Sequence, residues 1–161
     1  MTSLDQNQLV ADLARDIVAQ TAPQELPLFR ATSAAYFKNP DKLLKSRGSK
    51  DEMLGFGAGE AVLMLTPSVL FIVNQVVTFV IAEVQKAVAE ESSNLLDDLV
   101  KKMFKKFRPE HEQNAPPSLT PAQLVNVHQL AYEEASRLAL SDAQAKLLAD
   151  SIVGSLAIGS P

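Results

Sequence analysis

The sequence predicts an all-α fold: a helical bundle around one long apolar central helix at about residues 67–90, with a C-terminal helical hairpin after a proline-rich linker. Two observations predict this architecture. Apolar residues recur in several segments at the three- and four-residue spacing of an amphipathic helix. In addition, residues 61–82 form a run of 22 positions without a charged side chain. The chain of 161 residues is long enough for one domain with a substantial core.

The composition narrows the chemistry that is available to the protein. The chain contains no cysteine, which excludes disulfides, thiolate metal sites and a thiol nucleophile. A formal net charge of −4 argues against a protein that binds duplex nucleic acid, because such binding depends on neutralising phosphates. The opening residues, MTSLDQNQLVADLARD, lack the basic and apolar regions of a secretory signal peptide. We therefore expect a cytoplasmic location, with membrane association as an open alternative.

The first helix is expected at residues 4–20, where Ser3 and Gln6 have the spacing of a capping box. Its apolar residues recur on one face. They are Leu9, Val10, Leu13, Ala14, Ile17 and Val18. This pattern predicts an amphipathic helix with one side buried.

A second helix is expected to end near Asn39, because the residue before Pro40 is disfavoured in a helix. Residues 41–52 are charged and contain a glycine, which predicts a loop with a short helical turn at Asp41–Lys45. The glycine-rich run at residues 55–60, GFGAGE, has neither the dinucleotide-binding spacing nor the lysine of a P-loop. We expect it to be a flexible connection or a place of close backbone approach.

The central helix is expected to begin at Thr66 and Pro67, a capping residue followed by a proline at the first helical position. A strand pair joined at Asn74 and Gln75 is the alternative, since the segment is rich in β-branched residues. Glutamine is poorly suited to a two-residue hairpin turn, and the sequence offers no other strand to pair with. The helical interpretation is therefore preferred.

A helical projection divides this segment into a wide aliphatic arc and a narrower polar one. The expected core or interface residues are Val69, Leu70, Ile72, Val73, Val76, Val77, Val80 and Ile81. The polar stripe is expected to contain Ser68, Asn74, Gln75 and Thr78. A helix of this kind is surrounded by apolar material on most sides, and its amides need a partner on a neighbouring helix.

The apolar material around the central helix could be protein or lipid. Thirteen Val, Leu, Ile and Phe residues in 61–82 favour membrane insertion by roughly 6 kcal/mol, whereas an unpaired buried amide costs about 2 to 7 kcal/mol. The segment has no Trp or Tyr at either end to form an interfacial belt. We expect the helix to be enclosed by protein, and a membrane-inserting protein with 61–82 in the bilayer is the alternative.

A further amphipathic helix is expected at residues 95–107, with leucine and phenylalanine opposite lysine. Its apolar arc points nearly opposite to that of the central helix, so a bend near Ser92 or different packing partners are expected. The helix resembles those that lie on anionic lipid, although such a face is usually only solvated. Residues that could contact lipid or an acidic partner are Lys101, Lys102, Lys105, Lys106 and Arg108.

We expect three regions: a helical domain at 1–107, a proline-rich linker at 108–120 and a C-terminal hairpin at 121–158. The hairpin begins at Thr120 and Pro121, and Ser141 caps its second helix. Its apolar faces contain Leu124, Val127, Ala131, Ala135 and Leu138, then Leu147, Leu148, Ile152 and Leu156. About forty residues are marginal for independent stability, so this hairpin should dock on the rest of the chain or on another molecule.

The sequence suggests no catalytic, cofactor-binding or metal site. His111 lies in the linker, and His128 and Tyr132 are expected to form a surface pair. Neighbouring carboxylates such as Asp97 and Asp98 point apart on a helix and cannot share a proton. We expect a non-enzymatic interaction or scaffold protein with a protein partner, most simply a second copy of the chain, without a cofactor, a small-molecule substrate or nucleic acid.

Overall fold

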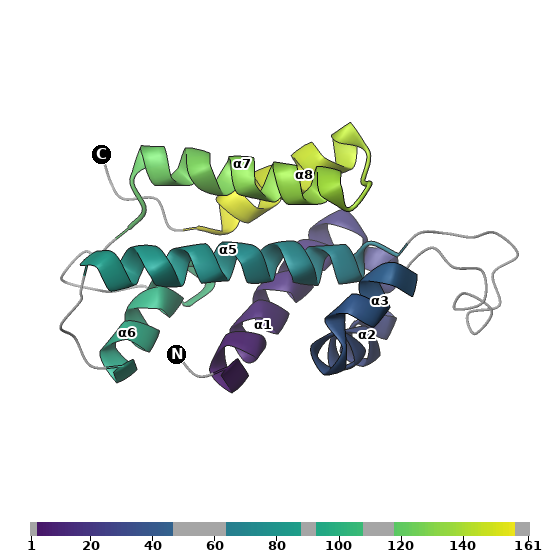
Figure 1. The fold of residues 1–161 in the computed structure, drawn as a ribbon, viewed down its shortest axis with the longest axis horizontal. Helices are drawn as coiled ribbons and strands as arrows, with labels where there is room; N and C mark the ends of the chain where they lie inside the picture. The colour runs from purple at the N-terminus through teal and green to yellow at the C-terminus, as the bar shows by residue number, and fades with distance from the viewer. Residues whose placement is uncertain (1–2, 47–63, 88–92, 108–117, 157–161) are drawn as a thin grey trace, which may run out of the picture.

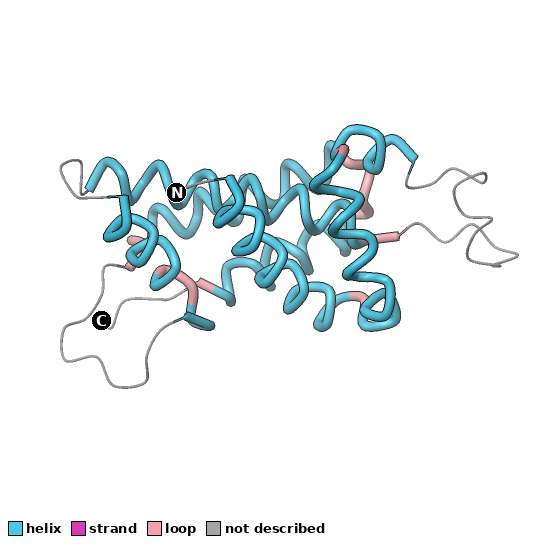
Figure 2. The backbone as a smooth tube through the Cα atoms, turned by 90° about the horizontal axis from the view of Figure 1, so that it is seen from below, coloured by secondary structure: helices cyan, strands magenta, loops and turns pink. Residues whose placement is uncertain are grey.

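The structure is a computed structural model that describes residues 3–46, 64–87, 93–107 and 118–156. These residues form α-helices joined by turns and short 3-10 helices, and Figure 2 shows no strand among them. In chain order the elements are α1 (Ser3–Thr21), η1 (Pro23–Glu25), α2 (Leu26–Lys38), α3 (Pro40–Ser46), α5 (Thr66–Ala87), α6 (Ser93–Lys102), η3 (Lys105–Phe107), α7 (Pro121–Arg137) and α8 (Asp142–Ser155). The predicted all-α bundle is confirmed.

Helix α5 is the centre of the bundle. It runs along the longest axis, with α7 and α8 on one side and α2, α3, α6 and most of α1 on the other (Figure 1). Helices α1, α2, α3, α6 and α7 all pack against it, while α8 packs on α7 and α1. The long apolar helix therefore packs against five helices of the same chain among the described residues.

One hydrophobic core joins the N-terminal and C-terminal parts of the chain. Its buried side chains come from α1, α2, α5, α6, α7 and α8, and include Leu9, Ile17, Leu70, Val77, Val127, Leu148 and Ile152. The α7–α8 pair is thus docked on the N-terminal helices through its apolar face. Most of the predicted linker, residues 108–117, lies outside the described residues, as do residues 1–2 and 157–161.

The N-terminal helices follow the sequence patterns closely. Helix α2 ends at Lys38, and Asn39 leaves the helical conformation directly before Pro40. The helical turn expected at Asp41–Lys45 is part of a longer element, α3. The glycine-rich run at 55–60 lies outside the described residues, as does the expected bend at 88–92.

The continuous helix predicted for residues 95–107 is wrong. Helix α6 ends at Lys102, and the backbone N–H of Phe104 bonds three residues back, to the carbonyl of Lys101. Met103 and Phe104, which follow the last residue of α6, are both buried, and Phe104 is only 1% exposed. The backbone of Phe104 also forms an isolated antiparallel bridge with Leu156, just after α8. Burial of Phe104 against the C-terminal part therefore ends the helix early.

Helices α7 and α8 both begin with a complete capping box, formed by Thr120 with Gln123 and by Ser141 with Gln144. Their contact is close because small residues line it. The buried alanines are Ala131 and Ala135 on α7, with Ala145 and Ala149 on α8. Leu147, which was expected on the apolar face, is instead 48% exposed. The alanines occupy the contact face, which turns Leu147 to the outside.

Candidate interaction surface

The aliphatic side of α5 is enclosed. Seven of the eight residues expected there are buried: Val69, Leu70, Ile72, Val73, Val76, Val77 and Val80. Ile81 is half-buried and packs against the same core. This arc covers about half of the circumference of the helix, because the buried positions follow the three- and four-residue spacing of a wide apolar stripe.

The opposite side of α5 is open from Phe71 to Gln85. We call this surface the α5 ridge, and it consists of Phe71, Gln75, Thr78, Ala82 and Gln85. The spacing of four, three, four and three residues places them in one line along the helix. Thr78, Ala82 and Gln85 are exposed, while Phe71 and Gln75 are half-buried. No residue of the ridge is charged.

One edge of the ridge is held by α1. The side-chain nitrogen of Gln6 donates to Asn74 Oδ1 at 3.2 Å and to Thr78 Oγ1 at 3.1 Å. The side-chain oxygen of Asn74 therefore has its hydrogen-bond partner on another helix, as expected for a helix that packs within protein. From its spacing to Ser3, Gln6 is expected only as half of a capping box, and nothing in the local pattern indicates this long-range contact. Ser68, also expected in the polar stripe, is buried in the first turn of α5.

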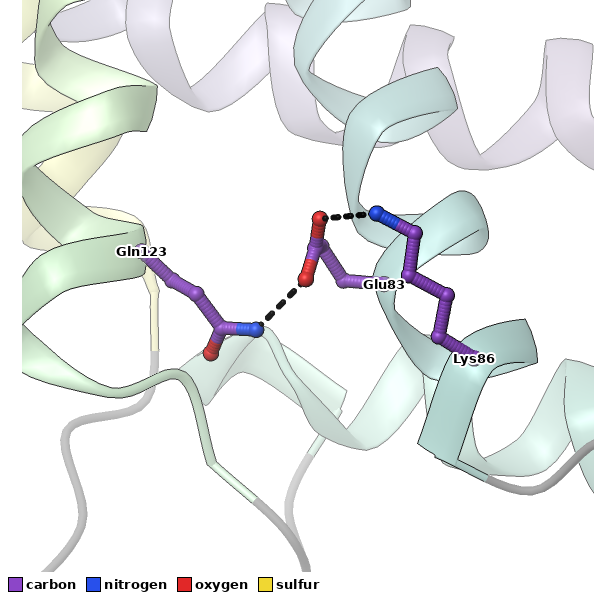
Figure 3. A network of polar contacts seen from close by, with 3 residues as sticks. All are labelled: Glu83, Lys86 and Gln123. Carbon is purple, nitrogen blue, oxygen red and sulfur yellow. Dashed lines mark hydrogen bonds and ion pairs between the residues drawn. The ribbon is translucent and has the colours of Figure 1, made fainter.

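Near its C-terminal end α5 is joined to α7 by a polar network (Figure 3). Glu83 accepts a hydrogen bond from the Gln123 amide at 2.7 Å and pairs with Lys86 at 3.3 Å. The hydrogen bond from Gln123, and then the nearby ammonium of Lys86, lower the pKa of the Glu83 carboxyl group. Gln123 also closes the capping box at the start of α7, so one side chain positions this helix start against α5.

The first turn of α5 is fixed by a carboxylate from η1. Glu25 accepts the backbone N–H groups of Leu65 and Thr66, each at 2.9 Å, and the Thr66 hydroxyl at 2.7 Å. The sequence predicted the Thr66 hydroxyl as the cap, whereas in the structure it donates to the glutamate. A carboxylate near a helix N-terminus is favourable because it meets unpaired N–H groups and the positive end of the helix dipole.

Two of the lysines predicted to contact lipid or acid form ion pairs within the chain. Lys101 and Lys105 are exposed, while Lys102 pairs with Asp98 at 3.1 Å. Lys106 forms an ion pair with Asp16 of α1 at 3.1 Å, which ties η3 to the N-terminal helix. Arg108 lies outside the described residues. The basic segment is thus partly used for contacts within the chain.

His128 and Tyr132 of α7 contact α8 rather than each other. The His128 imidazole lies 2.8 Å from Asp150, and the Tyr132 hydroxyl donates to Asp142. The expected surface pair of His128 and Tyr132 is therefore replaced by two contacts between the helices. The hydrogen bond to Asp142, and its negative charge, raise the pKa of Tyr132. Among the described residues, no group of three His, Cys, Asp or Glu side chains could hold a metal ion.

No family model, curated protein or solved structure matches this chain. Within the part of the chain that the structure describes, α5 is the one helix long and apolar enough to cross a membrane by length and composition. The core helix of a globular protein has the same property, and the most apolar part of α5 is 56% buried inside the bundle. The fold and its surfaces therefore define the class of protein: an all-α bundle with an enclosed apolar helix.

Proposed function

We propose that this chain is a non-enzymatic helical interaction protein of the cytoplasm, which associates with protein through an exposed helix face. The α5 ridge carries this proposal. It is an uncharged strip about 21 Å long, from the rise of 1.5 Å for each of its 14 residue steps. Centres of protein interfaces are depleted of charged residues and enriched in aromatic ones, and the ridge has both properties.

The enclosure of α5 supports association through the ridge rather than through the whole helix. Its aliphatic side already packs on α1, α2, α3, α6 and α7, and this packing leaves the ridge as the uncovered side. The half-buried Phe71 and exposed Ala82 contribute apolar surface, while Gln75 and Thr78 contribute hydrogen-bonding groups. Such a mixture suits a contact between folded proteins that also exist apart.

The test is expression of the full chain without detergent, followed by fractionation and size-exclusion chromatography with light scattering. We expect the protein in the supernatant, with a measured mass above that of one chain or a partner protein co-eluting. Leu70→Asn should unfold the bundle, because it places an amide in the closed core. Recovery only in the membrane fraction, with Leu70→Asn moving it to the supernatant, would refute the proposal.

A membrane-inserting protein is the second candidate, and α6 is the observation that favours it. Its Leu95 is 41% exposed, and Lys101 and Lys105 are exposed on the same segment. Basic amphipathic helices bind anionic lipid through this combination. Replacing Lys101 and Lys105 by glutamine should then reduce flotation with vesicles that contain phosphatidylserine. Unchanged flotation, or none by the unmodified chain, would remove this candidate.

A further inference from the structure

We propose that the α5 ridge binds the α5 ridge of a second copy of this chain, with the two helices antiparallel about a two-fold axis. This inference deepens the proposed function and rests on it. A two-fold contact uses the same surface on both copies, so the surface must be complementary to itself. The order of side chains along the ridge meets this condition.

The pairing follows from the positions of the ridge residues. If the axis passes midway between Gln75 and Thr78, Phe71 of one copy lies opposite Ala82 of the other, and Gln75 lies opposite Thr78. A large side chain then meets a small one at both ends of the contact, which is how packed helices interdigitate. In the middle, the Gln75 amide nitrogen of one copy can donate to the Thr78 hydroxyl oxygen of the other. The proton of this hydroxyl is donated to the Asn74 carbonyl of its own helix.

The electrostatics of the ridge also favour a second copy. Two identical surfaces bring like charges together whenever a charged residue lies close to the axis, and the ridge contains none. The ionised groups of this region, Glu83 and Lys86, pair with each other beside the ridge. Two copies can therefore approach without removing an ion from water, which would be costly.

The size of the ridge sets the expected strength. The paired residues from Phe71 to Ala82 span about 16.5 Å, and a contact of this length and roughly one helix wide is smaller than the roughly 800 Å² per partner of a standard interface. We therefore expect a reversible dimer that dissociates on dilution, which sedimentation velocity over a hundredfold range of concentration would detect. A chain that remains monomeric throughout would overturn the inference.

The decisive variant is Ala82→Glu, which adds a charge to an exposed position of the ridge. It should raise the dimer dissociation constant about tenfold or more, because two carboxylates would be buried without partners. Ala34→Glu, at an exposed alanine of α2, adds the same charge away from the ridge and should leave the constant unchanged. Circular dichroism of both variants verifies that they fold. Equal dimerisation of the two variants would overturn the inference while leaving self-association, and so the proposed function, intact.

The antiparallel direction is tested by single cysteines, since the natural chain has none. Gln75→Cys places the two thiols about 4.5 Å apart along the axis, which allows a disulfide under mild oxidation. Ala82→Cys separates them by about 16 Å, too far for a disulfide. Equally fast cross-linking of both variants would indicate a parallel contact and overturn the pairing.

A vesicle flotation experiment shows whether the α5 ridge binds protein or lipid. The unmodified chain and Ala82→Glu are mixed with phosphatidylcholine–phosphatidylserine vesicles. If the ridge binds a second copy, both should remain unbound. Flotation of the unmodified chain that Ala82→Glu abolishes would assign the ridge to the bilayer, and it would overturn both this inference and the proposed function. Binding of a different protein through the ridge by a monomeric chain would overturn the inference alone.

Discussion

Replacing Glu25 with alanine is expected to destabilise the bundle by about 3 kcal/mol, because the start of the central helix loses three hydrogen bonds. The carboxylate accepts the N–H groups of Leu65 and Thr66 and the Thr66 hydroxyl. Alanine leaves these donors without an acceptor in a place where Glu25 itself is only 9% exposed.

The magnitude follows from the number of donors. An unsatisfied buried donor costs about 1 to 3 kcal/mol, and loss of a helix cap costs about 0.5 to 2 kcal/mol. Water entering the space left by the side chain would recover part of this, so about 1 kcal/mol for each donor is the expected value. A change of this size is a large fraction of the roughly 5 to 15 kcal/mol that stabilises a typical domain.

The assay is urea unfolding of the full chain, followed by circular dichroism. The midpoint should fall while the slope of the free energy with urea stays the same, because the surface exposed on unfolding hardly changes. Gln24→Ala, at the exposed neighbouring position, is the control and should stay within about 0.5 kcal/mol of the unmodified protein. Glu25→Gln retains one acceptor oxygen and should lose less than alanine does.

A double-mutant cycle isolates the contact between Glu25 and Thr66. Thr66→Val removes the hydroxyl that lies 2.7 Å from the carboxylate. Its effect should be smaller when Glu25 is already alanine, with a coupling free energy of at least about 0.5 kcal/mol. A loss below about 0.5 kcal/mol for Glu25→Ala, or a coupling of zero, would show that the glutamate does not hold the helix start.

Three further changes test the packing and the polar contacts. Val77→Ala should lower the free energy of unfolding in urea by about 1 to 3 kcal/mol. The same change at Val125, which is 64% exposed, should lower it hardly at all, and equal losses would contradict the burial of Val77 in the core. Ala139→Gly should raise the thermal midpoint, because Ala139 has a φ of 63° that glycine adopts without strain. Gln123→Ala should weaken the pH dependence of stability, because the hydrogen bond from Gln123 lowers the pKa of Glu83 in the folded protein. A lowered pKa stabilises the fold above the pKa that the carboxyl group has in the unfolded chain, and this contribution is lost as the pH falls through the folded pKa. An unchanged pH profile would contradict this role of Gln123.

The division of α5 into a buried and an open side could be predicted from the sequence. Asn74, Gln75 and Thr78 share one arc of the helical projection, and the structure leaves this arc half-buried or exposed. The reason is that burial of an amide or hydroxyl without a partner is unfavourable, so polar groups mark the side that neighbouring helices do not cover. Ser68 departs from the pattern, because it lies in the first turn of α5, which is buried all round.

The contacts that join distant parts of the chain could not be predicted. Glu25 is forty residues from Leu65, and nothing near either residue indicates that they meet. The early end of α6 has the same origin, since its cause is the burial of Phe104 beside Leu156. Local periodicity indicates which face of a helix is apolar. It does not indicate which element packs on that face, or where a distant contact ends the helix, because both depend on the tertiary fold.

Hydropathy alone could not decide whether α5 belongs in lipid or in protein, because both surroundings are apolar. The distinction comes from the partner of Asn74. In the bundle its oxygen accepts from Gln6, and the same amide nitrogen reaches Thr78, so α1 answers the polar groups at the edge of the ridge. A lone helix in a bilayer would leave these groups unpaired, at a cost of about 2 to 7 kcal/mol for an amide, which is comparable to its entire gain from insertion. Helix α1 therefore stabilises α5 within the bundle in two ways, by packing against it and by donating a hydrogen bond to the side-chain oxygen of Asn74.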